Sequence, residues 1–455
     1  MTAATVQEYG WVPLRNLLAD GLTAGESDIW QTRILHQASR LSRQLERRSR
    51  LFGLERRDEG MTLTVGGVVG SVQLAGCELR IAPKFVPKDR WEEPWEHAVL
   101  QMVGRATGRR WTTARSTRVA PGSARFFDHV ARAFADAVHE AMRSDPVRTW
   151  QTFEEEHQVL RGRLLVARQL RSMLSRPGVI HCAVDRLHAD NPVNHLLHWA
   201  AVRFEALVRD SATRRRVAAA SAWLPRIRPP VRVPALELIR LPPQYAHWSE
   251  AVDLALLLAR NLAQHPGGGA DAGHALLVDS ADLYEGFIER SLQLTVPGCG
   301  RGWRVEAQDQ RTFAKPVEGT KKSYSTRPDD VVYKDDEPVL LIDAKYKKLG
   351  DADLMALKKP ANADIYQLAA SALAHGCSQG LLLYPKIVDD ELADSKLRLW
   401  EVTLPGAEEK TIRLGAIAVD LMKLTDQSDF GAFDQHLLEQ VGKMLPELLE
   451  DAAGQ

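Results

Sequence analysis

The chain has 455 residues, of which 45% are hydrophobic and 26% are charged, a composition typical of a globular protein with a substantial core. At about 100 to 200 residues a domain, this length predicts two or three domains. The 59 basic and 59 acidic residues cancel, which excludes a generally basic protein, so any nucleic-acid surface must be a local patch.

The first part of the chain is expected to be a mixed α/β module. Apolar residues recur with helical spacing in residues 29–50, 126–142, 194–208 and 248–262. Short runs separated by glycines predict strands at residues 62–65, 68–74 and 78–81. Residues 160–174 are expected to form a strand that leads into a helix.

Lysine usage and a glycine-rich stretch indicate where this module ends. Before Lys315 the only lysines are Lys84 and Lys88, whereas lysine is frequent afterwards. Residues 265–274 contain three consecutive glycines and are the best linker candidate. We therefore expect one region at residues 1–264, of one or two subdomains, and a second domain at residues 275–455.

The second domain shows the order helix, strands, helix, strand, which predicts an α/β (α+β) fold. Helices are expected at residues 280–294 and 361–373, and strands at residues 303–307, 329–333, 339–345 and 380–384. Residues 334–338 contain two aspartates and a proline, so they suit a hairpin turn between the two central strands.

Cysteine spacing and apolar runs bear on the compartment. The four cysteines are far apart and form no CxxC pair, which disfavours a zinc site or a disulfide framework and fits a reducing cytoplasm. Residues 1–10 lack a basic region followed by an apolar run, and the apolar run at residues 251–259 is too short to span a bilayer. We expect a cytoplasmic protein without membrane contact.

The hairpin carries the chemistry. Side chains alternate between the faces of a strand, so Asp343 and Lys345 project from the same face. The hairpin returns Asp329 towards Asp343, and two carboxylates and one lysine converge. Burying such charges unpaired is costly, so this group predicts a functional site, although an ordinary surface Asp–Lys pair remains the alternative.

Phosphodiester hydrolysis suits this set of groups. Mg²⁺ prefers oxygen ligands and needs only one or two protein carboxylates, so Asp329, Asp343 and the backbone carbonyl of Ala344 are the expected ligands, with Mn²⁺ able to substitute. The ion would polarise the phosphate and acidify a bound water. Lys345 would orient or help deprotonate that water and offset developing negative charge.

Two helical residues are further candidates for the site. Glu285 would be an additional metal or water contact, or else a solvated carboxylate. Gln367 would contact the site or the DNA backbone, or else be a surface amide. Lys321 and Lys322, shortly before the hairpin, are candidates for phosphate contact because of their location.

The motifs together resemble the McrC family, the nuclease subunits of McrBC modified-DNA (5-methylcytosine) restriction systems. The resemblance covers most of the chain and is clearest at Arg327-Pro328-Asp329, Asp343-Ala344-Lys345-Tyr346-Lys347 and Asp364-Ile365-Tyr366-Gln367. Looser matches include Ile81-Ala82-Pro83-Lys84-Phe85 and Leu160-Arg161-Gly162-Arg163-Leu164.

The resemblance implies a restriction-endonuclease-like PD-(D/E)xK domain, a mixed sheet flanked by helices, with Asp329, Asp343 and Lys345 as the catalytic positions. It also implies that the first region binds a hexameric McrB-like AAA+ GTPase, stimulates its hydrolysis and couples it to the cutting of modified double-stranded DNA. A nucleotide-binding GxxxxGK[ST] loop is absent from this chain.

Three functions are compatible with these patterns. The first is an Mg²⁺-dependent DNA endonuclease that needs a motor partner. The second is a regulatory subunit that activates the motor without cleaving DNA. The third is a stand-alone nuclease. The intact Asp329, Asp343 and Lys345 argue against the second, and the large first region argues against the third.

Overall fold

The computed structural model describes residues 3–18, 24–44, 51–58, 60–75, 77–91, 95–106, 126–172, 176, 178–225, 227, 239–262, 275–317, 322–347, 360–387, 396–404, 410–424 and 430–453. The chain divides into two compact units, one of Met1–Phe126 with Gln264–Gln455 and the other of Phe127–Ala263. The expected linker, residues 265–274, and Lys321 lie outside the described residues. None of the described helices is both long and apolar enough to cross a membrane.

The first sheet of unit 1 joins the two ends of the chain. Its strands, in spatial order, are β1 (Ala3–Gln7), β6 (Cys77–Ala82), β5 (Val68–Leu74) and β10 (Ala275–Asp279). β10 pairs antiparallel with β5, so the strand that opens the expected second domain completes a sheet built by the first. The compact units therefore differ from the expected division into residues 1–264 and 275–455.

One glycine permits this closure. Gly70 of β5 has a φ of +130°, and a Cβ there would lie 2.1 Å from the carbonyl oxygen of Leu276 in β10. Only glycine adopts such a backbone without strain. The sheet buries Val72, Leu79 and Leu277 in one apolar cluster, which makes β10 part of the first core.

A second layer completes this part of unit 1. Strands β2 (Trp11–Pro13), β4 (Gly60–Val65) and β3 (Phe52–Arg57) form a small antiparallel sheet in that order. Helix α1 (Ala24–Gln44) contributes Ile34 and Ala38 to the same apolar cluster. The helix expected at residues 29–50 is therefore confirmed over residues 29–44, since residues 45–50 lie outside the described part.

The largest sheet of unit 1 among the described residues, which we call the second sheet, contains the predicted hairpin. Among the described residues it is six-stranded, in the order β11 (Trp303–Ala307), β14 (Asp330–Lys334), β15 (Glu337–Ala344), β16 (Gln379–Pro385), β18 (Lys410–Val419) and β17 (Arg398–Leu404). β15, β16 and β18 run parallel, and the other pairs are antiparallel. Asp335 and Asp336 turn the hairpin with φ of 50° and 68°, a conformation that aspartate tolerates.

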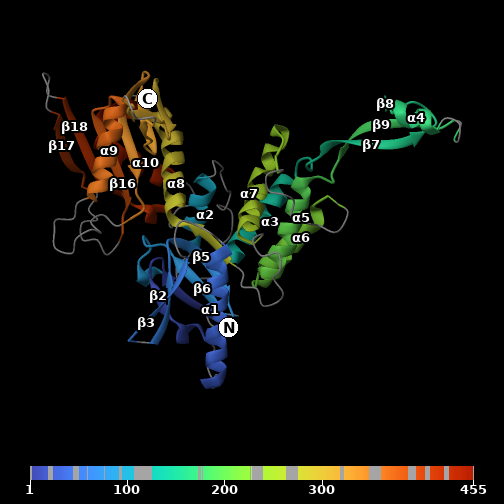
Figure 1. Ribbon diagram of the computed structural model, residues 1–455, viewed down its shortest axis with the longest axis horizontal. Coiled ribbons are helices and arrows are strands. Elements are labelled where there is room, and N and C mark those ends of the chain that lie inside the picture. Colours follow the sequence, from blue (N-terminus) through green and yellow to red (C-terminus); the bar gives the residue numbers. More distant parts are fainter. Residues whose placement is uncertain are drawn as a thin grey trace. The chain divides into compact units, whose positions relative to one another are not determined.

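Helices cover this sheet, as Figure 1 shows for α8 (Ser280–Thr295) and α9 (Asn362–His375). Leu341 packs with Leu368 and Ala372 of α9 in one core cluster. Leu340 and Ile342 are buried and alternate with Leu341 along β15. The α+β class and the mixed sheet flanked by helices are therefore confirmed.

The remaining elements of unit 1 surround this layer. They are α2 (Trp95–Ala106), which packs against α8, the hairpin of β12 (Arg311–Ala314) and β13 (Tyr324–Thr326) beside α9, α10 (Gly431–Gly442) and α11 (Pro446–Ala453). The tilted rings of Phe433 in α10 and Phe287 in α8 pack with their centres 4.8 Å apart, which holds these two helices together.

Unit 2 contains helices and a long strand pair. Its helices are α3 (Phe126–Ala141), α5 (Pro192–Leu207), α6 (Ser211–Trp223) and α7 (Ser249–Leu262). Strands β7 (Thr149–His157) and β9 (Ile180–His188), with β8 (Arg163–Leu164) and α4 (Val166–Ser172), form what we call the arm, which extends away from α5 and α6 in Figure 1. The predicted strand leading into a helix at residues 160–174 is confirmed by β8 and α4.

Candidate active site

The structure brings together Asp329, Asp343 and Lys345. Asp329 immediately precedes β14, Asp343 lies near the end of β15, and Lys345 follows that strand. The Lys345 Nζ is 2.9 Å from Asp343 Oδ2 and 3.8 Å from Asp329 Oδ2. The Ala344 N–H donates to Asp329 Oδ2 over 2.8 Å, so the backbone of one strand fixes the carboxylate of the other.

Burial makes this arrangement electrostatically demanding. Asp343 is 1% exposed, and its Oδ1 accepts no hydrogen bond from any described residue. Burial and the neighbouring Asp343 raise the pKa of Asp329 to about 8, against the opposing effect of Lys345. Although burial opposes it, the two carboxylates raise the pKa of Lys345, so this side chain is an ammonium at neutral pH.

These features fit a divalent cation. A buried carboxylate oxygen without a donor and two carboxylates that repel each other are both stabilised when a positive ion lies between them. No group of three or more His, Cys, Asp or Glu side chains in the described part of the chain has a metal-binding arrangement. Asp329 and Asp343, with the Ala344 carbonyl as the expected further ligand, are the groups that could hold Mg²⁺, which needs only one or two protein carboxylates.

The two helical candidates differ. Glu285, on α8, is partly buried, and burial raises its pKa while Lys345 lowers it and Asp343 raises it; it therefore lies within electrostatic reach of the site. Gln367 is exposed on α9, and no interaction among the described residues joins it to Asp329, Asp343 or Lys345. Lys322 is exposed before β13, and its contact with phosphate stays a prediction.

Asp364 reaches the segment that follows β15, although the sequence analysis did not single it out as a site residue. The Lys347 Nζ is 2.5 Å from its Oδ2, and the hydroxyl of Tyr384 donates to the same oxygen over 3.0 Å. Part of the signal was present in the sequence, because Asp364 is an acidic residue in the first turn of α9 and belongs to the Asp364-Ile365-Tyr366-Gln367 motif. This contact ties α9 to the end of β15.

Asp330 is the second unanticipated carboxyl group. It is completely buried, and neither of its oxygens accepts a hydrogen bond from a described residue. Burial first, and then Glu289 of α8, raise its pKa well above the ordinary range. Because Asp330 is next to Asp329 in sequence, alternation points its side chain away from that of Asp329.

Comparisons with known proteins find similar solved structures but no curated relative. A chain of the refined half-complex from a tetradecameric assembly of Thermococcus gammatolerans McrB AAA+ hexamers with bound McrC matches with a TM-score of 0.65 and 18% identity, over 97% of this chain and 100% of that chain. The cryo-EM structure of the Thermococcus gammatolerans McrBC complex matches with a TM-score of 0.47 and 19% identity, over 64% and 87% of the two chains. No curated protein matches.

At such low identity the half-complex shows a shared fold and nothing more. The family model described as McrBC 5-methylcytosine restriction system component matches residues 63–385, which include the arm and the strands β5, β10, β14, β15 and β16 of unit 1. Because this match spans most of the sequence, the chain belongs to the McrBC 5-methylcytosine restriction system component family.

Proposed function

We propose that this chain is the nuclease subunit of a modification-dependent restriction system, an Mg²⁺-dependent endonuclease that cuts double-stranded DNA when coupled to a McrB-like AAA+ GTPase. The observation that carries the proposal is the convergence of Asp329, Asp343 and Lys345 at the end of the central hairpin. An ordinary surface ion pair would not contain a buried Asp343 with an oxygen that lacks a hydrogen-bond donor, because burying such an oxygen destabilises the fold.

The residues of the site have distinct roles in this mechanism. Asp329, Asp343 and the Ala344 carbonyl would hold Mg²⁺, which supplies polarisation of the scissile phosphate and a more acidic bound water. The Ala344 N–H keeps Asp329 in place. Because the carboxylates raise the pKa of Lys345, its ammonium donates a hydrogen bond that orients the water and offsets charge on the phosphate. Glu285 would add negative charge beside this centre.

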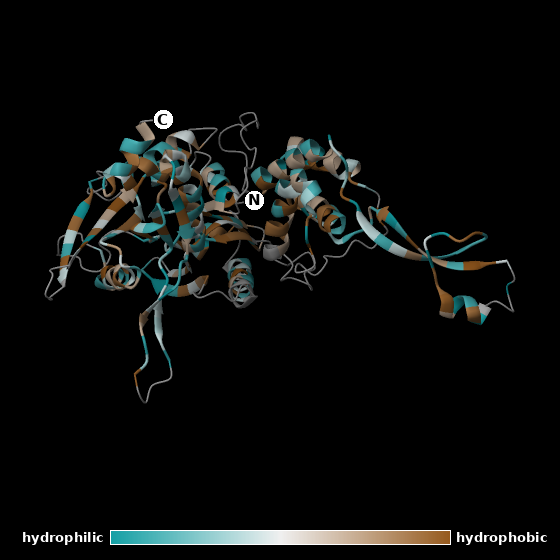
Figure 2. Ribbon diagram, turned by 90° about the horizontal axis from the view of Figure 1, so that it is seen from above, coloured by the Kyte–Doolittle hydropathy of each residue, from teal (hydrophilic) through white to brown (hydrophobic). Residues whose placement is uncertain are grey.

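The arm supports the proposal of a motor partner. It exposes large apolar side chains, among them Trp150, Val159, Leu160 and Leu170, and Figure 2 shows hydrophobic stretches along its strands. The arm consists mainly of the paired strands β7 and β9, with the short β8 and α4 beside them, so it has little core of its own. Exposed apolar clusters mark interaction surfaces. The similar half-complex is described as McrB AAA+ hexamers with bound McrC, and we assign the AAA+ partner to this surface.

Plasmid cleavage tests the proposed function. Methylated and unmethylated plasmid would be incubated with Mg²⁺, GTP or ATP, and the purified chain with and without the AAA+ protein from the same genome. We expect cutting that requires the partner and nucleotide and that is lost in Asp343→Ala. Cutting by the chain alone would favour a stand-alone nuclease. Stimulated nucleotide hydrolysis without Asp343-dependent cutting would favour a regulatory subunit.

A further inference from the structure

Tyr346, the residue after Lys345, is held at both ends by the first sheet of unit 1. The Lys84 Nζ donates to the Tyr346 carbonyl oxygen over 2.8 Å and lies 4.1 Å from the centre of the Tyr346 ring. The Tyr346 hydroxyl donates to Glu8 Oε1 over 2.5 Å. Glu8 follows β1 and Lys84 follows β6, two parallel neighbours in that sheet.

Glu8 is itself fixed in place. It is 3% exposed, and its Oε1 also accepts the backbone N–H of Lys84 over 2.7 Å. Its Oε2 accepts the hydroxyl of Ser280, the first residue of α8. The first sheet, the start of α8 and the segment after β15 therefore meet at one buried carboxylate.

The junction of these three segments around Glu8 buries more polar groups than packing alone requires. An apolar junction of the same size would avoid the cost of removing a carboxylate and an ammonium from water. Such polar contacts are expected where a junction must hold a neighbouring side chain, here that of Lys345, in one position. β15 ends at Ala344. The Lys345 N–H still donates to the Leu383 carbonyl over 2.8 Å, but its carbonyl accepts the Lys347 N–H over 2.9 Å, which is a turn and not a strand ladder. The direction of its side chain then depends on where the next residue is held.

We propose that Glu8 and Lys84 are positioning residues for Lys345 and act through Tyr346, so that the first sheet sets the geometry of the nuclease site. The inference rests on the proposed function for its effect on cleavage. Its structural part, the placement of the Lys345 ammonium, is measurable without cleavage. A misplacement of about 1 Å is enough to slow an enzyme greatly.

Two variants of the full-length chain, assayed with its AAA+ partner, test whether Glu8 and Lys84 position Lys345 through Tyr346. Lys84→Met removes the donor to the Tyr346 carbonyl, and Tyr346→Phe removes only the hydroxyl that donates to Glu8. We expect kcat for plasmid cleavage to fall by about tenfold to a hundredfold, the range found when groups that orient site residues are removed, with KM for DNA unchanged. Lys84→Arg, which keeps a cationic donor, should restore most of the rate.

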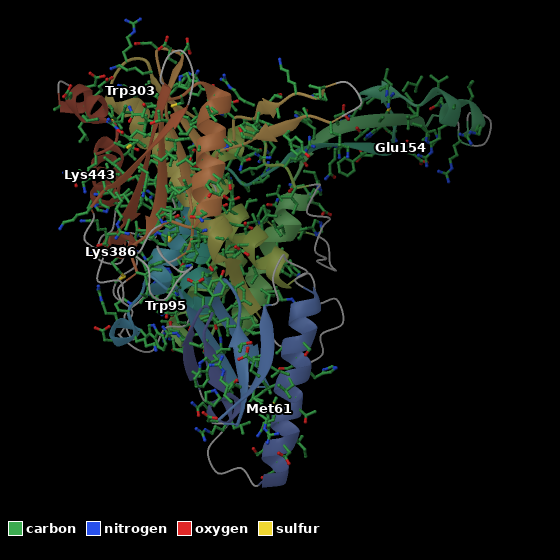
Figure 3. The ribbon with its side chains drawn as sticks, turned by 60° about the vertical axis from the view of Figure 1, so that its left-hand side comes forward. Met61, Trp95, Glu154, Trp303, Lys386 and Lys443 are labelled. Atoms are coloured by element: carbon green, nitrogen blue, oxygen red, sulfur yellow. The ribbon has the colours of Figure 1, made fainter. Side chains whose placement is uncertain are left out.

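A second measurement does not require cutting. The rate at which acetic anhydride modifies Lys345 is followed by mass spectrometry relative to Lys386 and Lys443, which are labelled in Figure 3. Lys345 is 18% exposed and paired with Asp343, so its release from this pair should raise the relative rate several-fold in Lys84→Met and Tyr346→Phe. Asp343→Ala is the positive control for a freed Lys345.

Arg80→Met is the matched control for damage to the first sheet. Arg80 lies on β6 and pairs with the buried Glu96 of α2, and in the part of the chain that the structure describes no hydrogen bond or ion pair joins it to Tyr346. It should lower stability but leave the Lys345 acetylation rate unchanged. The inference is overturned if Lys84→Met and Tyr346→Phe acetylate Lys345 as wild type does, or if Arg80→Met raises that rate equally. A wild-type chain that fails to cut would refute the proposed function alone.

Discussion

At the scale of single residues, Asp329 and Asp330 are sequence neighbours with different surroundings. Asp329 accepts the Ala344 N–H and lies beside Lys345. Asp330 is buried without a hydrogen-bond donor among the described residues and has a pKa raised mainly by that burial. The sequence Asp329-Asp330 alone does not distinguish them, but the start of β14 and the alternation of its side chains do.

Because of this difference, we expect a change from aspartate to asparagine to lower the cleavage rate at position 329 and to leave it nearly unchanged at position 330. Asp329→Asn removes a charged ligand and should lower the rate of plasmid cleavage by about a hundredfold or more, the scale on which loss of a preorganised electrostatic group slows an enzyme. Asp330→Asn replaces a buried carboxyl group, whose pKa burial raises, with a neutral amide of the same shape and should keep a rate near that of wild type. Initial rates with saturating partner and Mg²⁺ check both. Equal loss in the two variants would contradict the assignment of Asp329.

At the scale of elements, the partner surface proposed on the arm can be tested separately from folding. Its strands carry ion pairs across the ribbon, such as Glu155 with Arg186 at 2.7 Å, and charged side chains such as Glu154, labelled in Figure 3, lie along β7. Leu160 and Leu170 are more than half exposed. Exposed side chains away from packed or strained positions contribute about 0.5 kcal/mol or less to stability.

The double variant Leu160→Glu, Leu170→Glu should therefore weaken partner binding without unfolding the chain. Charges placed in an apolar contact lose their hydration when the partner binds, which costs free energy. The concentration of this chain that gives half-maximal stimulation of nucleotide hydrolysis should therefore rise by at least about tenfold, equivalent to about 1.4 kcal/mol of binding free energy. Titration of hydrolysis against chain concentration measures this, with the melting temperature as the stability check. Val202→Glu, at an exposed position of α5, is the matched control. Unchanged titration in the arm variant would remove the arm from the interface.

The elements also show how far the sequence predicts the structure. The hairpin of β14 and β15 was predictable because its pairing and its turn at Asp335 and Asp336 are local. The arm was largely missed because β7 and β9 carry polar and charged residues and show little of the apolar alternation that marks a half-buried strand. The partner of β10 was missed because pairing with β5 joins segments far apart in the chain.

The residues of the candidate site also differ in whether the sequence could predict them. Asp329, Asp343 and Lys345 could be predicted because one hairpin brings them together. Glu8 could not, because its contact with Tyr346 joins residues 338 positions apart and no local pattern encodes it. Gln367 was proposed from its place in a motif, whereas the buried Asp364 is the member of that motif that contacts the segment that follows β15.

At the scale of the whole molecule, the division into units predicts which parts fold alone. Replacing residues 127–263 with a long flexible glycine–serine linker removes unit 2 and keeps every described strand of the unit 1 sheets. We expect this chain to unfold cooperatively on heating but to lose stimulation of the AAA+ partner. Calorimetry and the hydrolysis assay measure the two properties.

A fragment of residues 275–455 is the informative counterpart. It lacks β5, so Leu276 and Leu277 of β10, both buried in the intact chain, would be exposed to water, and α8 would lose α2. We expect it to aggregate or to show no cooperative transition. Cooperative folding of this fragment, together with failure of the chain that lacks unit 2, would contradict the division.

The pairing of β5 with β10 also has a consequence during protein synthesis. β5 is complete at Leu74, but its edge stays open until Ala275–Asp279 leaves the ribosome. At about 5 to 20 residues a second, the intervening stretch of roughly 200 residues takes about 10 to 40 seconds to translate. Unit 2 is finished by Ala263 and is therefore expected to fold first. During that wait the valine-rich edge of β5 is a template for pairing with other nascent chains, so chaperones should associate with ribosomes that have not yet translated β10.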